Sequence, residues 1–135
     1  MESIVVPAHN ADPEPINDFV EEALSLHACP SKTLYQLQVA IEEIFVNIVS
    51  YAQLSEEDGI EIRCGVFDDP TRVVLQFLDK GIPFDPLTIE DPDISPDALM
   101  DREGGLGIFR VKQMMDEVSY VYENGTNILT IQKQL

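Results

Sequence analysis

Two hairpins constrain the fold of this 135-residue chain more than any other sequence feature. From Gly59 to Val66, apolar residues recur at every second position, and turn-forming residues at 68–71 lead into an apolar run at 73–78. This pattern predicts two strands joined by a short connection. Since the strands of a hairpin pair antiparallel, these segments require antiparallel pairing in the sheet.

The second hairpin lies near the C-terminal end of the sequence. Residues 118–122 and 128–131 read as strands, and the connection between them contains Asn124-Gly125. An Asn-Gly pair favours the tight turn of a hairpin because both residues tolerate a positive φ. A further strand is expected at 3–7, at an edge of the sheet, because Pro7 cannot donate a ladder hydrogen bond.

Three segments predict helices. Residues 12–27 start with Asp12 as the expected N-cap, 31–52 start with Ser31 in the same role, and 107–115 follow a run of glycines. The long central helix carries an apolar stripe at spacings of three and four, formed by Leu34, Leu37, Ile41, Ile44, Phe45, Ile48 and Ala52.

The order of the elements is strand, two helices, hairpin, loop, helix, hairpin. We therefore expect one α+β domain over residues 1–135, a two-layer sandwich with a mixed, mostly antiparallel sheet and helices on one face. The segment 80–105 holds four prolines and three glycines and predicts a long loop, with one helical turn at about 96–100. A loop of this length inside a small domain is commonly functional.

Charge and composition narrow the location and the partners. Eight Lys and Arg residues stand against 25 Asp and Glu residues, a net charge of −17 that repels nucleic acids and anionic membranes. The charge either keeps the protein soluble or attracts a basic protein partner. No apolar run is long enough to span a bilayer and no signal peptide is evident, so we expect a cytoplasmic location. Cys29 and Cys64 lie among apolar residues and are predicted to be buried thiols.

Glu43 and Asn47 form the first candidate site, on the central helix. At about 100° per residue they lie within roughly 40° of each other, away from the apolar stripe, whereas Glu42 points to another side. A carboxylate and a carboxamide one turn apart suit a base beside a metal ligand. The same pair is also common on a solvated helix face, and the helix alone favours that interpretation.

Two further motifs follow the predicted strands and loop. Asp79 ends a strand and can accept a hydrogen bond from an exocyclic amine, and Gly81 allows a flat ring to approach the backbone. Taken alone, this segment also reads as an ordinary turn. Gly104-Gly105-Leu106-Gly107 leads into a helix, where backbone N–H groups and the helix N-terminus together attract an anion such as phosphate. A single glycine-rich loop is weak evidence.

The order of the three motifs resembles the N, G1 and G2 boxes of the GHKL, or Bergerat-fold, ATPases. The phrases Ile41-Glu42-Glu43, Gly81-Ile82-Pro83-Phe84 and Gly104-Gly105-Leu106-Gly107 are most similar to the anti-sigma factor serine kinases of the RsbW type. Gly125-Thr126 matches the last box. A sensor histidine kinase fits less well, since neither His9 nor His27 lies on a long predicted helix.

The resemblance implies the following roles. Glu43 would be the catalytic base and Asn47 the Mg²⁺ ligand. The nucleotide, ATP or ADP, would be bound by Asn47, Asp79, Gly81, Phe84, Gly104, Gly105, Leu106, Gly107 and Thr126, with Asp79 on the adenine amino group. Residues 86–103 would cover it.

The implied function is an anti-sigma factor and serine-protein kinase that binds a sigma factor, phosphorylates an antagonist protein and forms a homodimer. A non-catalytic, nucleotide-gated binding module with the same boxes is the alternative. A purely structural interaction domain is disfavoured by the four boxes in order.

Overall fold

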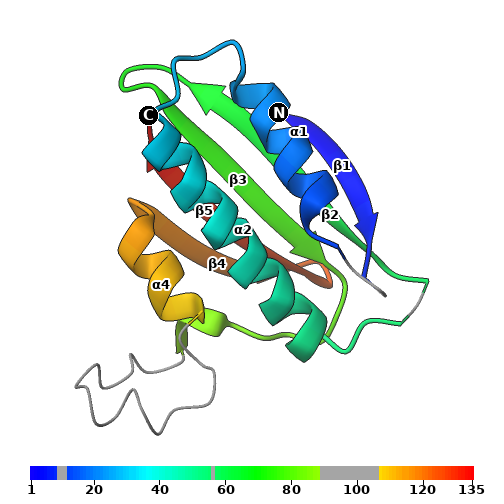
Figure 1. Ribbon diagram of the computed structural model, residues 1–135. Helices are drawn as coiled ribbons and strands as arrows, with labels where there is room; N and C mark the ends of the chain where they lie inside the picture. The colour runs from blue at the N-terminus through cyan, green and yellow to red at the C-terminus, as the bar shows by residue number, and fades with distance from the viewer. Residues whose placement is uncertain (9–11, 56, 89–106) are drawn as a thin grey trace, which may run out of the picture.

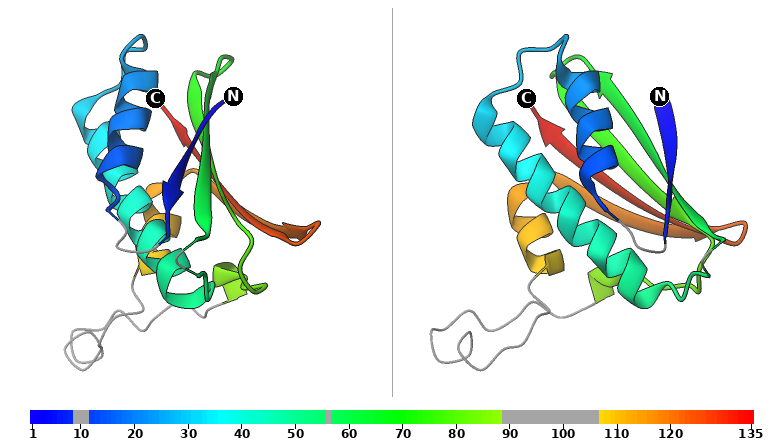
Figure 2. Two further views of the ribbon diagram at one scale, coloured as in Figure 1. Left: turned by 90° about the vertical axis from the view of Figure 1, so that its right-hand side faces the viewer. Right: turned by 45° about the vertical axis from the view of Figure 1, so that its right-hand side comes forward.

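The computed structural model describes residues 1–8, 12–55, 57–88 and 107–135. These residues form two layers, a five-stranded sheet and a set of α-helices that covers one face of it (Figure 1). The elements in chain order are β1 (Glu2–Pro7), α1 (Glu14–Leu24), α2 (Ser31–Tyr51), β2 (Gly59–Phe67), β3 (Arg72–Asp79), the 3-10 turn η1 (Pro86–Thr88), α4 (Gly107–Met114), β4 (Glu117–Glu123) and β5 (Thr126–Gln134). The α+β class and the two-layer arrangement are confirmed, and Figure 2 shows the helices on one side of the sheet only.

The strands are arranged in the order β1-β2-β3-β5-β4, with β1 at an edge as expected. All four pairings among the described strands are antiparallel, so the sheet is not mixed. The position of the last hairpin explains this difference. Since β4 and β3 run in the same direction, a parallel pair would arise if they were neighbours. Instead β5 lies between them and pairs antiparallel with both.

The final hairpin turns as the Asn-Gly pair predicts. Asn124 and Gly125 have φ angles of 52° and 75°. Two consecutive residues with positive φ give a turn whose twist matches that of the flanking strands. Glu123 consequently pairs with Thr126, and this close pairing fixes the register of β4 against β5.

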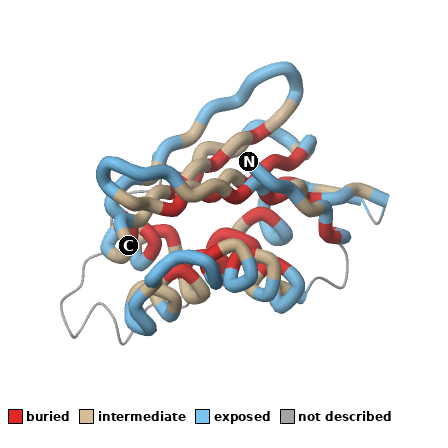
Figure 3. Tube along the Cα trace, turned by 90° about the horizontal axis from the view of Figure 1, so that it is seen from above, coloured by how far each residue is buried: buried red, intermediate tan, exposed pale blue. Residues whose placement is uncertain are grey.

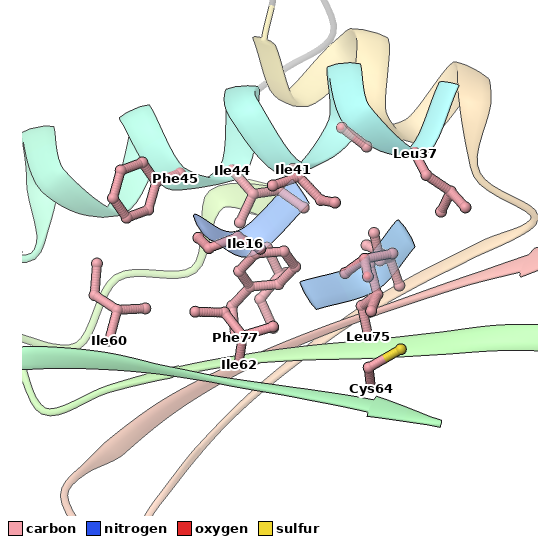
Figure 4. Packing of buried hydrophobic residues seen from close by; sticks show 14 of the residues in the cluster. Ile16, Leu37, Ile41, Ile44, Phe45, Ile60, Ile62, Cys64, Leu75 and Phe77 are labelled. Atoms are coloured by element: carbon pink, nitrogen blue, oxygen red, sulfur yellow. The ribbon is translucent and has the colours of Figure 1, made fainter. Parts of the chain in front are cut away.

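The core lies between the sheet and the helices, where buried residues of both layers face each other (Figure 3). Figure 4 shows the apolar side of α2 above β2 and β3. The predicted stripe on α2 is confirmed, since all of its members except the half-buried Leu34 are buried. Burial of each large apolar side chain contributes about 1.5–3 kcal/mol. The largest fully buried side chains of the two layers are those of Ile16, Val20, Leu37, Ile41, Ile44, Phe45, Ile60, Ile62, Val73, Leu75, Phe77 and Ile131.

Two predicted helix caps are wrong by one residue. Pro30, in an extended conformation at ψ 147°, is the N-cap of α2, and Ser31 is already helical. Pro13 occupies the cap position of α1, although the Asp12 Oδ1 atom still accepts a hydrogen bond from the Glu14 N–H at 3.0 Å. In both places a proline with its fixed φ precedes the helix directly. The helical turn expected at 96–100 lies outside the described residues.

Both cysteines are free thiols, Cys64 buried and Cys29 half-buried. Burial, and then the charge of Glu2, raises the pKa of Cys64 to about 11. No helix in the described parts of the chain has both the length and the apolar character needed to cross a membrane.

Candidate functional site

The exposed side of α2 and the start of α4 enclose a hollow of about 150 Å³. Glu43 and Asn47 both line it, so the pair predicted from the sequence faces one space. Gly107, the first residue of α4, lines the same hollow from the other side. Glu42 is exposed and does not line the hollow, as the helical geometry predicts.

Gly107 lies directly against Glu43. A Cβ atom at Gly107 would lie 2.5 Å from the Glu43 Oε2 atom, which is shorter than any ordinary contact. The absence of a side chain at this position therefore allows the first turn of α4 to approach the carboxylate. Of the predicted glycine-rich motif, Gly104, Gly105 and Leu106 lie outside the described residues.

Arg110 adds a positive charge that the sequence analysis missed. It lies on α4, one turn after Gly107, and its guanidinium donates a hydrogen bond of 3.0 Å to the Glu43 Oε1 atom. The two side chains are 51% and 26% exposed, so water screens the pair and its net contribution is about 0–1 kcal/mol. Arg110 follows Gly107, a predicted site residue, by three positions. Residues three apart on a helix lie on the same side, so this spacing could have identified Arg110 from the sequence.

A second, inner pocket lies between α2 and the sheet, and Asn47 lines this pocket as well. Asp79, which is 5% exposed and is the last residue of β3, also lines this pocket. The Asp79 Oδ1 atom accepts hydrogen bonds of 2.9 Å from the Gly81 N–H and from the Asn127 Nδ2 atom. Within the described part of the chain, no group donates to Oδ2. Among these residues, one carboxylate oxygen is thus held by two donors, and the other keeps its capacity to accept a hydrogen bond.

Asn127 is a second residue that the sequence analysis did not identify. It directly follows the predicted Thr126, but adjacent residues of a strand point to opposite faces. Asn127 lines the inner pocket and contacts Asp79, whereas Thr126 lines another hollow, which Asp79 and Lys80 also line. The alternation along β5, counted from the hairpin turn, was a signal that could have identified it.

The structure gives a packing reason for glycine at position 81. Its φ is not positive, but a Cβ atom there would lie 2.2 Å from the Ala52 carbonyl oxygen at the end of α2. The same carbonyl accepts a hydrogen bond of 3.0 Å from the Ile82 N–H. The glycine therefore lets the loop after β3 dock against the C-terminal end of α2.

Phe84 also reaches α2 through this loop. Its ring stacks on the ring of Tyr51, with centroids 5.0 Å apart and planes 19° apart. Phe84 and Pro86 line the inner pocket together with Asn47 and Tyr120. Burial raises the pKa of Tyr120, so its hydroxyl keeps its proton and remains a hydrogen-bond donor at neutral pH.

Asn47 thus connects two spaces that carry different chemistry. The outer hollow has the Glu43 carboxylate, which is paired with Arg110, and the N-terminal end of a helix, where N–H groups attract anions. The inner pocket is mostly apolar and has one buried carboxylate with a free oxygen. A ligand with a flat amine-bearing ring and an anionic tail matches this arrangement.

Comparisons with known proteins point the same way. A family described as the histidine kinase-like ATPase domain matches residues 6–133. The serine-protein kinase RsbW of Listeria monocytogenes serovar 1/2a is 33% identical over 103 residues, which are 73% of this chain and 64% of that protein. The kinase of the same name from Bacillus subtilis strain 168 is 30% identical over 95 residues, covering 68% of this chain and 59% of the relative. The chain thus spans less than two thirds of the length of these relatives.

Solved structures show the same fold. The RsbU and RsbW domains of Rv1364c from Mycobacterium tuberculosis superpose with a TM-score of 0.67 at 13% identity, over 100% of this chain and 33% of that one. The histidine kinase domain of the blue-light activated histidine kinase EL346 from Erythrobacter litoralis gives 0.56 at 18% identity, over 96% and 62%. At these identities the likeness concerns the fold alone.

Proposed function

Since the chain belongs to the histidine kinase-like ATPase domain family, we propose that it binds ATP and ADP with Mg²⁺ and acts as a serine-protein kinase. The observation that carries this proposal is the position of Asn47, which lines both the apolar pocket with Asp79 and the hollow with Glu43. A single nucleotide bound alongside Asn47 would extend from Asp79 in the inner pocket to Glu43 in the outer hollow.

The inner pocket would hold the adenine ring. The free Oδ2 atom of Asp79 accepts the hydrogen bond of the exocyclic amine, while Ile48, Phe77 and Leu129 provide an apolar surface for the ring. The pocket now has a volume of only about 20 Å³, which is about the room for a single water molecule. The residues that line it therefore have to move apart when a purine enters.

The outer hollow would hold the phosphates. Among the described residues the Asn47 side chain has no hydrogen-bond partner, so its amide oxygen is available to a hard cation, which prefers oxygen ligands. Bound Mg²⁺ would neutralise phosphate charge. Gly107, and with it Gly104, Gly105 and Leu106, would supply backbone N–H groups. Arg110 adds a cation at the same end of α4.

Glu43 is the candidate general base. It would accept the proton of a serine hydroxyl on the partner while that oxygen attacks the γ-phosphate and the bond to ADP breaks. The ion pair with Arg110 has to open first, and because both side chains are partly exposed this costs about 1 kcal/mol or less. The released guanidinium would then be free to pair with a phosphate oxygen.

The partners follow from the relatives and from the charge. The resemblance to anti-sigma factor kinases supports a sigma factor and an antagonist protein as the partners, a homodimer as the assembly and the cytoplasm as the location. The net charge of −17 suits partners with basic surfaces. Thr126 remains a predicted nucleotide contact, and it lines a hollow that Asp79 also lines, outside the inner pocket.

The pairing of Glu43 with Arg110 favours one alternative, a nucleotide-gated binding module that transfers no phosphate, because a paired carboxylate is held away from a proton donor. The two functions separate in a transfer assay with labelled ATP, Mg²⁺ and a candidate antagonist. We expect Glu43→Gln to bind ATP nearly as well as the wild type and to lose transfer by roughly 10²–10⁴-fold.

Glu42→Gln is the matched control, because Glu42 is exposed on the same helix and lines neither space. Its transfer rate should equal that of the wild type. A normal rate in Glu43→Gln would exclude Glu43 as the base. Nucleotide binding by the wild type without transfer to any partner would establish the non-catalytic module.

A further inference from the structure

Asn127 makes five side-chain hydrogen bonds to other described residues around the inner pocket. It is 5% exposed and lies opposite Asp79 in the β3–β5 register. Its Nδ2 atom donates hydrogen bonds to the Asp79 Oδ1 atom at 2.9 Å and to the Ile82 carbonyl at 2.8 Å, with the Gly81 carbonyl at 3.4 Å. Its Oδ1 atom accepts from the Phe84 N–H at 3.2 Å and from the Tyr120 hydroxyl.

These contacts allow only one orientation of the Asn127 amide. Its nitrogen side faces a carboxylate and two carbonyls, which are all acceptors, and its oxygen side faces two donors. A flipped amide would place its oxygen against Asp79 and its NH₂ group against the Phe84 N–H. An amide can donate two hydrogen bonds and accept two, and here the full capacity is used. Asn127 is therefore fixed without any ligand.

The fixed amide determines what Asp79 can offer to a ligand. The Asp79 Oδ1 atom is occupied by the Gly81 N–H and by Asn127, so the carboxylate cannot rotate without losing both bonds. No described residue donates to the Oδ2 atom, so this atom is the acceptor that Asp79 keeps for a ligand in the largely apolar pocket that it lines. Through Ile82 and Phe84, Asn127 also holds the loop after β3, which contributes Phe84 to the lining of this pocket.

On the basis of the proposed function, we propose that Asn127 is a positioning residue that sets the base selectivity of the nucleotide site. By holding Asp79 with one bare carboxylate oxygen toward the pocket, it selects a purine that carries an amino group at C6. A purine with a carbonyl oxygen at C6 would oppose that oxygen with a second acceptor. A site that hydrogen-bonds a ligand group rejects an analogue that leaves a buried partner unpaired.

ADP and inosine diphosphate test this proposal, because they differ in the group at C6. Their affinities are measured by calorimetry with Mg²⁺, for the wild type and for Asn127→Ala. We expect the wild type to prefer ADP by about tenfold or more, as for a hydrogen bond to a charged group. In Asn127→Ala the Asp79 carboxylate can rotate. The affinity for ADP should therefore fall while the affinity for inosine diphosphate changes little, and the ratio of the two affinities should approach one.

Asn127→Ser and Thr130→Ala complete the experiment. Serine keeps one donor at position 127, so this variant should fold even if the alanine variant does not, and its preference for ADP should be lower than that of the wild type. Thr130 lies on the same strand outside the pocket and contacts Gln76, so Thr130→Ala should keep the full preference.

The outcomes separate the two proposals. If both nucleotides weaken by the same factor in the position-127 variants, Asn127 supports the fold alone and does not set selectivity. If the wild type binds ADP but does not discriminate against inosine diphosphate, the positioning role is also refuted. If the wild type binds neither nucleotide, the proposed nucleotide site itself is wrong.

Discussion

The close approach of Gly81 to the end of α2 predicts that Gly81→Ala destabilises the protein before any ligand is considered. An added Cβ atom would lie 2.2 Å from the Ala52 carbonyl oxygen and 2.6 Å from the Ala52 Cβ atom. Both contacts involve the backbone or the first side-chain carbon, so neither can be relieved by a change of rotamer. The loop and the end of α2 have to separate.

The size of the effect follows from that separation. Restoring an ordinary contact requires a shift of roughly 1 Å, which breaks the 3.0 Å hydrogen bond from the Ile82 N–H to the same carbonyl. A broken, partly buried hydrogen bond costs about 1–3 kcal/mol, and the displaced loop adds packing strain of similar size. We expect a loss of about 2–4 kcal/mol in the free energy of unfolding, or roughly 8–15 °C in Tm for a chain of this length.

Thermal and urea unfolding, followed by circular dichroism, measure this loss. Lys80→Ala is the matched control, because Lys80 is the exposed neighbour of Gly81 and its truncation should stay within about 0.5 kcal/mol of the wild type. Adding Ala52→Gly to Gly81→Ala removes the 2.6 Å contact but not the 2.2 Å contact, so the double variant should recover only part of the loss. A Tm within about 2 °C of the wild type in Gly81→Ala would refute the reasoning, because it would show that the loop moves at little cost.

Three further predictions concern Asp79, the net charge and the buried thiol of Cys64. Asp79→Asn should weaken ADP binding about tenfold or more and shift preference toward inosine diphosphate, because it presents an amine to the base; unchanged affinity in calorimetry would remove Asp79 from the site. The association rate with a basic partner should fall as ionic strength rises from 0.01 to 0.1 M, where the screening length drops from about 30 to 10 Å; a flat rate in stopped-flow mixing would mean that the charge serves solubility alone. Because the pKa of the buried Cys64 thiol is raised to about 11, the unfolded chain loses this proton first, so stability should be unaffected at neutral pH and fall as the pH rises from about 9 to 11. Urea titrations at these pH values should show a shallower fall in Cys64→Ala, and equal slopes would contradict the prediction.

The sequence by itself determined the elements and their exposed and buried sides. The stripe on α2, the alternation in β2 and the Asn124-Gly125 turn are local patterns, and each depends on the period of one helix, one strand or one turn. The sequence also placed Glu43 and Asn47 on one side of α2, since the 3.6-residue period fixes that relation. The resemblance to a known family came from the order of short motifs along the chain.

The tertiary structure decided which side of each helix or strand contacts which other element. Arg110 contacts Glu43 across 67 positions of sequence, and Asn127 contacts Asp79 across 48, because of the packing of α4 on α2 and the register of β3 against β5. The sequence could not reveal that β5, not β4, lies beside β3, and this order made the sheet wholly antiparallel. The sequence also could not show that a side chain at position 81 would collide with the carbonyl oxygen of Ala52. A local pattern fixes the direction of a side chain relative to its own element, but its partner depends on the order, register and spacing of elements far apart in the chain.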